Sequence, residues 1–264
     1  MPMNLQKPTA ILSKRPSETA LNHKNIVGQS PLTRPTMTEQ DKRWQIHRHL
    51  AQDTDERLQL VRNAPKRIML IGADADISRS LLAARYPDAV FEEYDPNADF
   101  LKTAAAARKG GFWQKLTGKT IPQHCQALTA PLPEASADML WANLSLSRAD
   151  DILPVLKNWA AALKTDGLLF FTHFGRDSLS ELTGRLNHEG IKCEAPTLID
   201  MHDLGDMLAD NGFYDPVTDT AKLELSYKKA GTFWQDMETL GLRDALKCSD
   251  PQAAEDYVDN IFNT

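Results

Sequence analysis

Short apolar runs alternate with helical patterns through the middle of the chain, and this alternation constrains the fold more than any other feature. Residues 67–71 (Arg-Ile-Met-Leu-Ile) form one such run, which stops at Gly72 as a strand buried on both faces would. The β-α-β order predicts an α/β fold with a mainly parallel sheet and helices on both faces. Further strands are expected at residues 89–93, near His124, at 138–144 and at 167–173, with helices at 77–85, 96–108 and 151–163.

The pattern changes after residue 173. Residues 177–188 and 201–211 have helical periodicity, and residues 216–227 form two strand-like stretches that meet near Thr220 and Ala221. We therefore expect a C-terminal antiparallel addition to the sheet, followed by a last helical segment at 251–262.

Composition changes sharply near residue 38. Residues 1–38 contain five prolines, five basic residues and one acid, and such a polar segment cannot bury enough apolar surface to offset its ordering entropy. We expect a disordered basic tail at 1–38, one α/β domain at 39–242 and a helical tail at 243–264. Two other interpretations stay open: the first segment resembles an organellar transit peptide, and Met37 is an alternative start of translation.

The charge, cysteine and hydropathy patterns exclude several classes of protein. A net charge of −6 argues against a chain whose whole surface binds nucleic acid. Cys125, Cys193 and Cys248 are far apart with no CxxC pair, so we expect reduced thiols and neither a disulfide framework nor a metal site. No apolar stretch approaches the roughly 20 residues of a membrane helix, and no secretory signal is evident. We expect a cytoplasmic protein without a membrane span.

Two strand ends carry the residues that most suggest a ligand. In doubly wound sheets, ligands bind beyond the carboxyl ends of the strands, near the point where the strand order reverses. The first strand stops at Gly72, and the second strand leads to Asp95, 23 residues later. A carboxylate about 20 residues after a strand-to-glycine turn is the arrangement that binds the two hydroxyls of an adenosine ribose. A surface turn followed by an Asp-Pro helix start explains the same residues, and that alternative stays open.

Later segments of the chain carry a family resemblance. They are ADMLWANLSL at 137–146, LKTDGLLFF at 163–171, FGRDSLSEL at 174–182, DMHDLGDML at 200–208, and the pairs at 212–213 and 216–217. With them, residues 67–240 resemble the class I S-adenosylmethionine (SAM) methyltransferases, and among these the BioC family of malonyl-acyl-carrier-protein O-methyltransferases. The resemblance implies a Rossmann-like fold with a seven-stranded sheet, SAM as cofactor, and a place in biotin synthesis.

The reaction implied is methylation of the free carboxylate of a malonyl carrier-protein thioester. The resemblance assigns the ribose to Asp95, and it places Gln126 where the family usually has an acid that meets the adenine amine. The amide carbonyl of Gln126 can still accept a hydrogen bond. No catalytic residue is assigned, because a carboxylate oxygen is already a nucleophile and needs mainly positioning. The cofactor-binding residues implied are Gly72, Asp74, Asp95, Gln126 and Asn143.

The first strand end departs from the family's pattern. Leu70 occupies the place of the usual acid, and Asp74 and Asp76 stand where the family has glycines. One aspartate about 4 Å from the SAM carboxylate would cost about 4 kcal/mol at an effective dielectric constant near 20. Leu-Ser-Arg at residues 146–148 also replaces the family's usual Leu-His-Trp. The alternative is therefore a degenerate, non-catalytic binding or assembly factor; the same segments are also similar to a complex I assembly factor, which implies arginine hydroxylation.

A malonyl substrate needs a cation for its free carboxylate. The candidates follow the fourth and fifth strands of the expected sheet, and an arginine can bind a carboxylate through two parallel hydrogen bonds. They are Arg148, His173 and Arg176. The two arginines are also explained as surface charges that flank helices.

A basic stretch is a candidate docking surface for a partner. Residues 100–119 carry five basic residues and no acid, interleaved with Phe112 and Trp113. This pattern favours an acidic acyl carrier protein bound through electrostatic steering, and a solvated helix end explains it equally well. No nucleic-acid-binding motif accompanies it. The basic residues are Lys102, Arg108, Lys109, Lys115 and Lys119.

Overall fold

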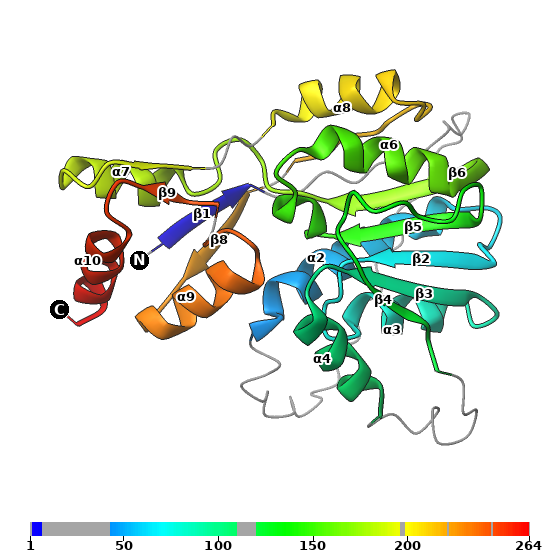
Figure 1. The fold of residues 1–264 in the computed structure, drawn as a ribbon, viewed down its shortest axis with the longest axis horizontal. Helices are drawn as coiled ribbons and strands as arrows, with labels where there is room; N and C mark the ends of the chain where they lie inside the picture. The colour runs from blue at the N-terminus through cyan, green and yellow to red at the C-terminus, as the bar shows by residue number, and fades with distance from the viewer. Residues whose placement is uncertain are drawn as a thin grey trace, which may run out of the picture.

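The centre of the structure, a computed structural model that describes residues 2–6, 43–109, 120–195, 199–220, 222–243 and 245–263, is a five-stranded parallel sheet (Figure 1). Its strands lie in the order β4-β3-β2-β5-β6, so the order reverses beside β2. The carboxyl ends of β2, β3 and β5 therefore meet at the switch point of a doubly wound fold, which confirms the predicted fold class. The strands are β2 (Arg67–Ile71), β3 (Val90–Asp95), β4 (Gln123–Cys125), β5 (Ala137–Asn143) and β6 (Leu163–Thr172).

Alternate residues of the strands enter two different cores, one on each face of the sheet. Ile68 and Leu70 pack with α2, α3 and α4, whereas Met69 and Ile71 pack with α6 and α8. Burial on both faces explains the continuous apolar runs of β2, β5 and the second half of β6. Figure 1 shows α6 and α8 above the sheet and α3 and α4 below it. The helices are α2 (Gln45–Arg57), continued by η1 (Leu58–Leu60), α3 (Ile77–Arg85), α4 (Ala98–Lys109), α6 (Ile152–Ala162) and α8 (Met201–Asp210).

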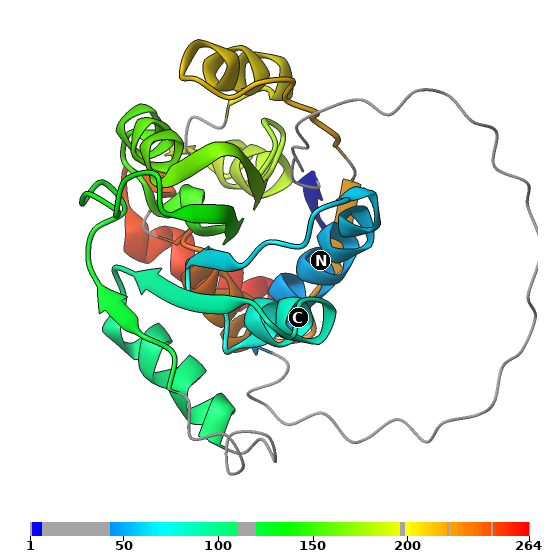
Figure 2. The ribbon, with the colours of Figure 1, turned by 90° about the vertical axis from the view of Figure 1, so that its right-hand side faces the viewer.

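Helices and short strands cover the carboxyl edge of the sheet, and we call this unit the cover. Its buried side chains share one cluster with Leu144 and Phe174, which follow β5 and β6, and with Ile46 and Leu50 of α2. The cover lies at the left in Figure 1 and behind the sheet in Figure 2. It comprises α7 (Ser180–His188), β7 (Cys193–Glu194), β8 (Lys222–Ser226), α9 (Ala230–Thr239), β9 (Lys247–Cys248), α10 (Pro251–Asn263) and β1 (Pro2–Gln6).

The sheet has five strands, so the expectation of seven is wrong. Of the two strands expected in residues 216–227, the described residues form only β8, which pairs antiparallel with β1 instead of joining the central sheet. Leu223 and Leu225 of β8 pack against the cover, while the residues between and beside them are exposed. Such a half-exposed strand suits a small two-stranded sheet better than a sheet buried on both faces.

Both expected tails contain residues that take part in the fold. Pro2–Gln6, assigned to the disordered tail at 1–38, form β1, and residues 7–42 lie outside the described residues. Average composition cannot reveal that one short segment of a polar tail finds an open strand edge. In the helical tail at 243–264, Ala254 and Val258 of α10 are buried in the same cluster as α7 and α9.

The expectation of reduced thiols is wrong for two of the three cysteines. Cys193 of β7 and Cys248 of β9 form a disulfide, and they face each other in the antiparallel β7–β9 pair. The fold brings them together across 55 residues, so no local spacing marks the pair. Cys125 is a free, exposed thiol.

None of the helices in the described part of the chain is long and apolar enough to cross a membrane. None of its groups of three or more His, Cys, Asp or Glu side chains is arranged to hold a metal ion.

Candidate functional site

Gly72 forms a tight turn just beyond the carboxyl end of β2. Its φ of +96° lies in a region that side chains disfavour, and a Cβ there would come within 2.8 Å of the Cβ of Ser145. The Gly72 N–H donates to the Tyr94 carbonyl at 2.8 Å, which ties the turn to β3. Glycine is therefore required here for both conformation and space.

Asp95 ends β3, and its side chain is fully buried. Its Oδ2 accepts from the Ala73 N–H at 2.7 Å and from Arg148 Nη1 at 3.0 Å. Its Oδ1 accepts from the Asn97 N–H at 2.6 Å, just before α4 begins. The residue expected to hold a ribose thus lies beside the Gly72 turn and already has three donors.

Asp74 and Asn143 meet in the buried space between the strand ends. Asn143 Nδ2 donates to Asp74 Oδ2 at 3.0 Å and to the His47 carbonyl at 2.9 Å. Asp74 also accepts from the N–H and the hydroxyl of Ser78, at 3.1 and 2.5 Å. Burial raises the pKa of Asp74, and the hydrogen bonds from Ser78 and Asn143 oppose that rise. The carboxyl of Asp74 is therefore held by the start of α3 and the end of β5.

The charge of Asp76 is compensated inside the protein. Asp76 is bound by Arg79 and, at 2.9 Å, by Arg108 Nη1, while Arg108 Nη2 donates to Glu93 at 2.8 Å. The positive charges of Arg79 and Arg108 reduce the repulsion that is expected from the sequence between Asp76 and the carboxylate of SAM. Counting Arg108 as part of a docking surface was wrong, because its side chain is only 7% exposed. Local sequence could not show that its acidic partners come from other elements.

Arg148 reaches the same space from η2 (Ser145–Arg148), the turn that follows β5. Besides Asp95, its guanidinium contacts the Phe100 ring, 4.6 Å from the centroid, and the Thr239 carbonyl at 3.5 Å. A Cβ on Gly241 would lie 2.7 Å from Arg148 Cγ, so the turn after α9 packs directly on this side chain. We call Gly72, Asp74, Asp95, Asn143 and Arg148 together the Asp95 cluster.

Gln126 lies just beyond β4. Its N–H donates to the Asp95 carbonyl at 3.3 Å, and its Nε2 donates to the Ala130 carbonyl at 3.5 Å. With Ile71 and Trp159 it lines a cavity of about 10 Å³, which is room for about one water molecule. In this conformation the space beside Gln126 is too small for an adenine ring.

Several buried polar atoms around the Asp95 cluster have no hydrogen-bond partner within the described part of the chain. Burial, and next the charge of Arg148, lower the pKa of His47 to about 3, so both its ring nitrogens lie buried in an uncharged ring. Buried polar atoms are nearly always bonded, so a group of unpartnered ones at a ligand-binding edge indicates a polar ligand. The atoms are Trp44 Nε1, His47 Nδ1 and Nε2, Ser145 Oγ and Arg148 Nε.

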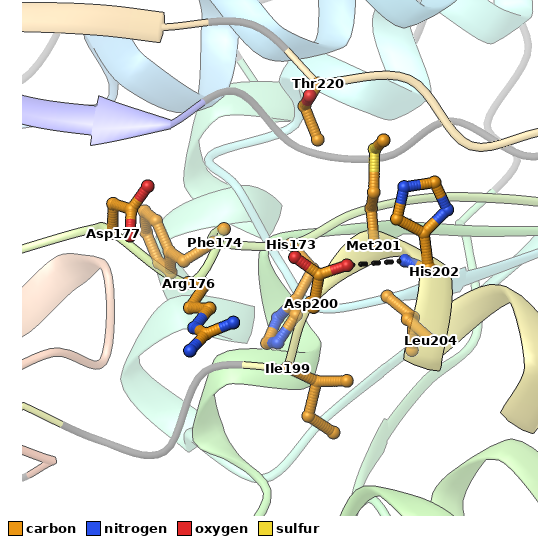
Figure 3. Close-up of a pocket in the computed structure, with 11 residues that line it drawn as sticks. His173, Phe174, Arg176, Asp177, Ile199, Asp200, Met201, His202, Leu204 and Thr220 are labelled. Atoms are coloured by element: carbon orange, nitrogen blue, oxygen red, sulfur yellow. Dashed lines mark hydrogen bonds between the residues drawn. The ribbon is translucent and has the colours of Figure 1, made fainter.

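A larger cavity, of about 310 Å³, lies where β6 ends and α8 begins, and we call it the Arg176 cavity (Figure 3). The loop after β6 contributes His173 and Arg176, and Figure 3 shows Thr220 on the opposite wall. Arg176 is exposed and has neither a hydrogen bond nor an ion pair with any residue that the structure describes. Burial lowers the pKa of His173 to about 4, and its Nδ1 has no partner among those residues. The cavity therefore combines a cation with a neutral imidazole.

Comparison with known proteins places these residues in a family. No family model matches the chain. The chain is 31% identical to the malonyl-acyl-carrier-protein O-methyltransferase of Laribacter hongkongensis, over 76% of this chain and 68% of that protein. It belongs to the malonyl-acyl-carrier-protein O-methyltransferase family. The enzyme of the same name from Gallionella capsiferriformans is 32% identical, over 70% of this chain and 64% of its own length, so the chain spans about two thirds of these relatives.

One solved structure is similar in fold to this chain. It is a chain of the Haloferax volcanii complex between the Trm112 methyltransferase activator and a methyltransferase. The identity is 16% and the TM-score 0.50, over 66% of this chain and 72% of that chain. At this identity the likeness concerns the fold alone.

The Asp95 cluster has groups that fit the SAM expected for a malonyl-acyl-carrier-protein O-methyltransferase. Gly72 allows a close backbone approach, Asp95 places a carboxylate beside it, and the unpartnered atoms of His47 and Ser145 offer further hydrogen bonds. In the conformation described, however, Arg148 already binds Asp95. Oδ1 of Asp95 accepts one hydrogen bond and Oδ2 accepts two, so for two ribose hydroxyls to bind one to each oxygen, Arg148 would have to leave Oδ2.

The structure divides the expected site residues of this family member between two places. Of the three cations expected for the malonyl group, His173 and Arg176 line one cavity, and Arg148 belongs to the Asp95 cluster. Ser145 was missed, although its place two residues after Asn143 at the switch point could have indicated it. Trp44 and His47 were also missed, because nothing in the sequence shows that α2 crosses this edge.

Proposed function

We propose that this chain transfers a methyl group from SAM to the free carboxylate of a malonyl carrier-protein thioester, the methylation step of biotin synthesis. Membership of the malonyl-acyl-carrier-protein O-methyltransferase family supports the proposal. The structural observation that carries it is Arg176, which has no ion-pair partner among the described residues and lines a cavity beside the Asp95 cluster. The two places adjoin through β5 and β6, because the Thr172 hydroxyl donates to Asn143 Oδ1 at 2.9 Å.

The proposed reaction depends more on positioning than on acid–base catalysis. A carboxylate oxygen is already nucleophilic, so the protein has to orient it and exclude water around it. SAM, when bound, supplies the electrophilic methyl group. Asp95 would accept hydrogen bonds from the ribose hydroxyls. Gln126 would offer its amide to the adenine after the small cavity beside it widens, because in the conformation described that cavity holds about one water molecule. Gly72 and Asn143 would complete the binding surface, and Asp74 would lie at its buried side.

His173 and Arg176 would bind the carboxylate of the malonyl group. Arg176 can present two parallel N–H groups to it. His173 is neutral at pH 7 because its pKa is about 4, so it would add a hydrogen bond without adding a second charge. Asp177 and Asp200 line the same cavity, so without Arg176 its lining would keep two acids and no arginine or lysine. Arg176 would therefore have a large effect on substrate binding.

An acidic acyl carrier protein is the partner that this substrate implies. Lys102 of α4 has a side chain 76% exposed, and its ion pair with Asp99 is equally exposed. Such a pair contributes little to stability and leaves the lysine accessible to a partner. Docking would use Lys102 rather than the buried Arg108. Lys115 and Lys119 lie outside the described residues, as does the side chain of Lys109.

The test is to incubate the chain with SAM and malonyl carrier protein and to detect the methyl ester by mass spectrometry. We expect the wild type to form the ester, and Arg176→Gln to raise KM for malonyl carrier protein by about tenfold or more. The reason is that a hydrogen bond between charged groups contributes about 1.5–3 kcal/mol. If no ester forms while SAM is bound, the proposed reaction is wrong and the non-catalytic alternative gains support.

A matched control separates a local role of Arg176 from a general loss of positive charge. Arg185 of α7 is exposed and does not line the Arg176 cavity. Arg185→Gln removes the same charge, and we expect KM to stay within about twofold, since surface substitutions usually have small effects. Equal changes in KM for both variants would contradict the assignment of Arg176.

A further inference from the structure

The proposed binding of the ribose by Asp95 does not explain why Asp95 is paired with Arg148. Asp95 Oδ2 already accepts two hydrogen bonds, from the Ala73 N–H and from Arg148, and the side chain is fully buried. A ribose hydroxyl can approach this oxygen only if one donor leaves. The Ala73 N–H is fixed by the Gly72 turn, whereas Arg148 is a long side chain that can rotate.

The guanidinium of Arg148 is incompletely bonded where it lies. Its Nε is buried without a partner among the described residues, and its contact with the Thr239 carbonyl is long, at 3.5 Å. A second carboxylate could satisfy these donors in a parallel, two-bond geometry. The face of the Phe100 ring, 4.6 Å away, would still support the guanidinium after a small rotation.

The other cations near the Gly72 turn are already committed. Arg79 binds Asp76, and Arg108 binds both Asp76 and Glu93. Among the arginines described here near the Gly72 turn, Arg148 is therefore the one with an N–H donor, Nε, that has no hydrogen-bond partner among the described residues.

We propose that Arg148 binds the amino-acid carboxylate of SAM, and that it exchanges Asp95 for this carboxylate when SAM binds. The exchange frees Asp95 for the ribose hydroxyls. SAM then gives each residue of the ion pair a new partner, its carboxylate for Arg148 and its ribose hydroxyls for Asp95. A nucleoside that lacks the carboxylate has to break the ion pair and offers Arg148 no new partner. The inference rests on the proposed function, since it takes SAM as the ligand.

Calorimetry with two unreactive ligands tests the exchange. S-adenosylhomocysteine carries the amino-acid carboxylate, whereas 5′-methylthioadenosine has the same nucleoside without it. For the wild type we expect S-adenosylhomocysteine to bind at least about tenfold more tightly. In Arg148→Gln we expect the affinity for S-adenosylhomocysteine to fall by about tenfold and that for 5′-methylthioadenosine to rise, because Asp95 is released. Opposite changes for the two ligands are the signature of the exchange.

Two further variants keep the test decisive. Arg148→Lys retains the charge, so we expect part of the preference for S-adenosylhomocysteine to return. Arg185→Gln removes an exposed arginine that lies outside both the Asp95 cluster and the Arg176 cavity, so both affinities should stay as in the wild type. Circular dichroism and urea unfolding of each variant verify that it is folded.

Each remaining outcome contradicts the proposal in a different way. If Arg148→Gln weakens both ligands equally, Arg148 has only a structural role. If it changes neither affinity, Arg148 does not meet the ligand. If neither ligand binds to the wild type or to any variant, the exchange and the proposed function both fail, whereas binding of both ligands without a change in preference overturns the exchange alone.

Discussion

The two halves of the candidate site lie at the ends of neighbouring strands and differ in how their charges are satisfied. In the Asp95 cluster, Asp95 is fully buried and paired with Arg148, and Asp74 is held by Asn143. In the Arg176 cavity, Arg176 is exposed and unpaired within the described part of the chain. One half is closed by its own ion pairs, and the other offers an unpaired cation.

This difference matters for Asp74 and Asp76, the two aspartates that follow Gly72. Counted from the sequence, Asp74 and Asp76 add two negative charges beside an anionic ligand. In the structure, Arg79 and Arg108 bind Asp76, and Ser78 and Asn143 donate hydrogen bonds to Asp74. The carboxylates of Asp74 and Asp76 thus have partners inside the protein, so they do not by themselves argue against a bound ligand. The open half keeps its arginine free for substrate.

The largest expected effect comes from the disulfide that joins β7 to β9 within the cover. Replacing Cys193 and Cys248 by serine should lower the free energy of unfolding by about 4 kcal/mol, since the closed loop spans 55 residues. Urea denaturation measures this change, and Cys125→Ser, at an exposed free thiol, is the matched control. Because the turn after α9 packs on Arg148, ligand binding at Asp95 should weaken more than substrate binding at Arg176. An equal loss of both would break the distinction between the halves.

The next effect compares one charged residue from each half. Asp95→Asn leaves Arg148 largely buried without its ion-pair partner, so we expect a loss of about 3 kcal/mol in unfolding free energy. Arg176→Gln changes an exposed, unpaired side chain, so we expect a change within about 0.5 kcal/mol. The same urea titrations measure both. Similar losses for the two variants would mean that the two halves do not differ as described.

The sequence predicted the framework of the site because that framework depends on short-range patterns. The apolar run of β2 ending at Gly72, and the distance to Asp95, place both residues at the switch point of a parallel sheet. Asn143 lies there for the same reason, at the end of β5. Strand ends of a parallel sheet meet at one edge whatever the details of packing, so a local pattern was sufficient.

The pairing of charges could not be predicted in the same way. Arg148 and Asp95 are 53 residues apart, and Arg108 and Asp76 are 32 apart. Which acid an arginine meets depends on side-chain direction after the helices pack, and the sequence supplies no periodicity for that. The β1–β8 pair depended likewise on an open strand edge, which a composition average over residues 1–38 conceals.

The smallest expected effect per residue is on how the free energy of unfolding depends on pH. Each half contributes through one buried histidine, His47 beside the Asp95 cluster and His173 in the Arg176 cavity. The pKa is lowered to about 3 for His47, by burial and then by Arg148, and to about 4 for His173 by burial. The unfolded chain, with a histidine pKa near 6.5, therefore takes up protons first, and stability falls as the pH drops below about 6.5. At pH 5 each histidine should have removed about 2 kcal/mol of unfolding free energy. The loss through His173 should end near pH 4, while that through His47 continues toward pH 3.

Urea titrations between pH 7 and pH 4 measure these losses. His47→Gln and His173→Gln should each make the pH profile less steep, because each removes one buried histidine. Arg148→Gln adds a test of the link within the closed half. Removing that charge should raise the pKa of His47 toward its ordinary value and make the acid loss smaller, without altering the contribution of His173. If Arg148→Gln changed the profile through His173 instead, the electrostatic separation of the two halves would be wrong.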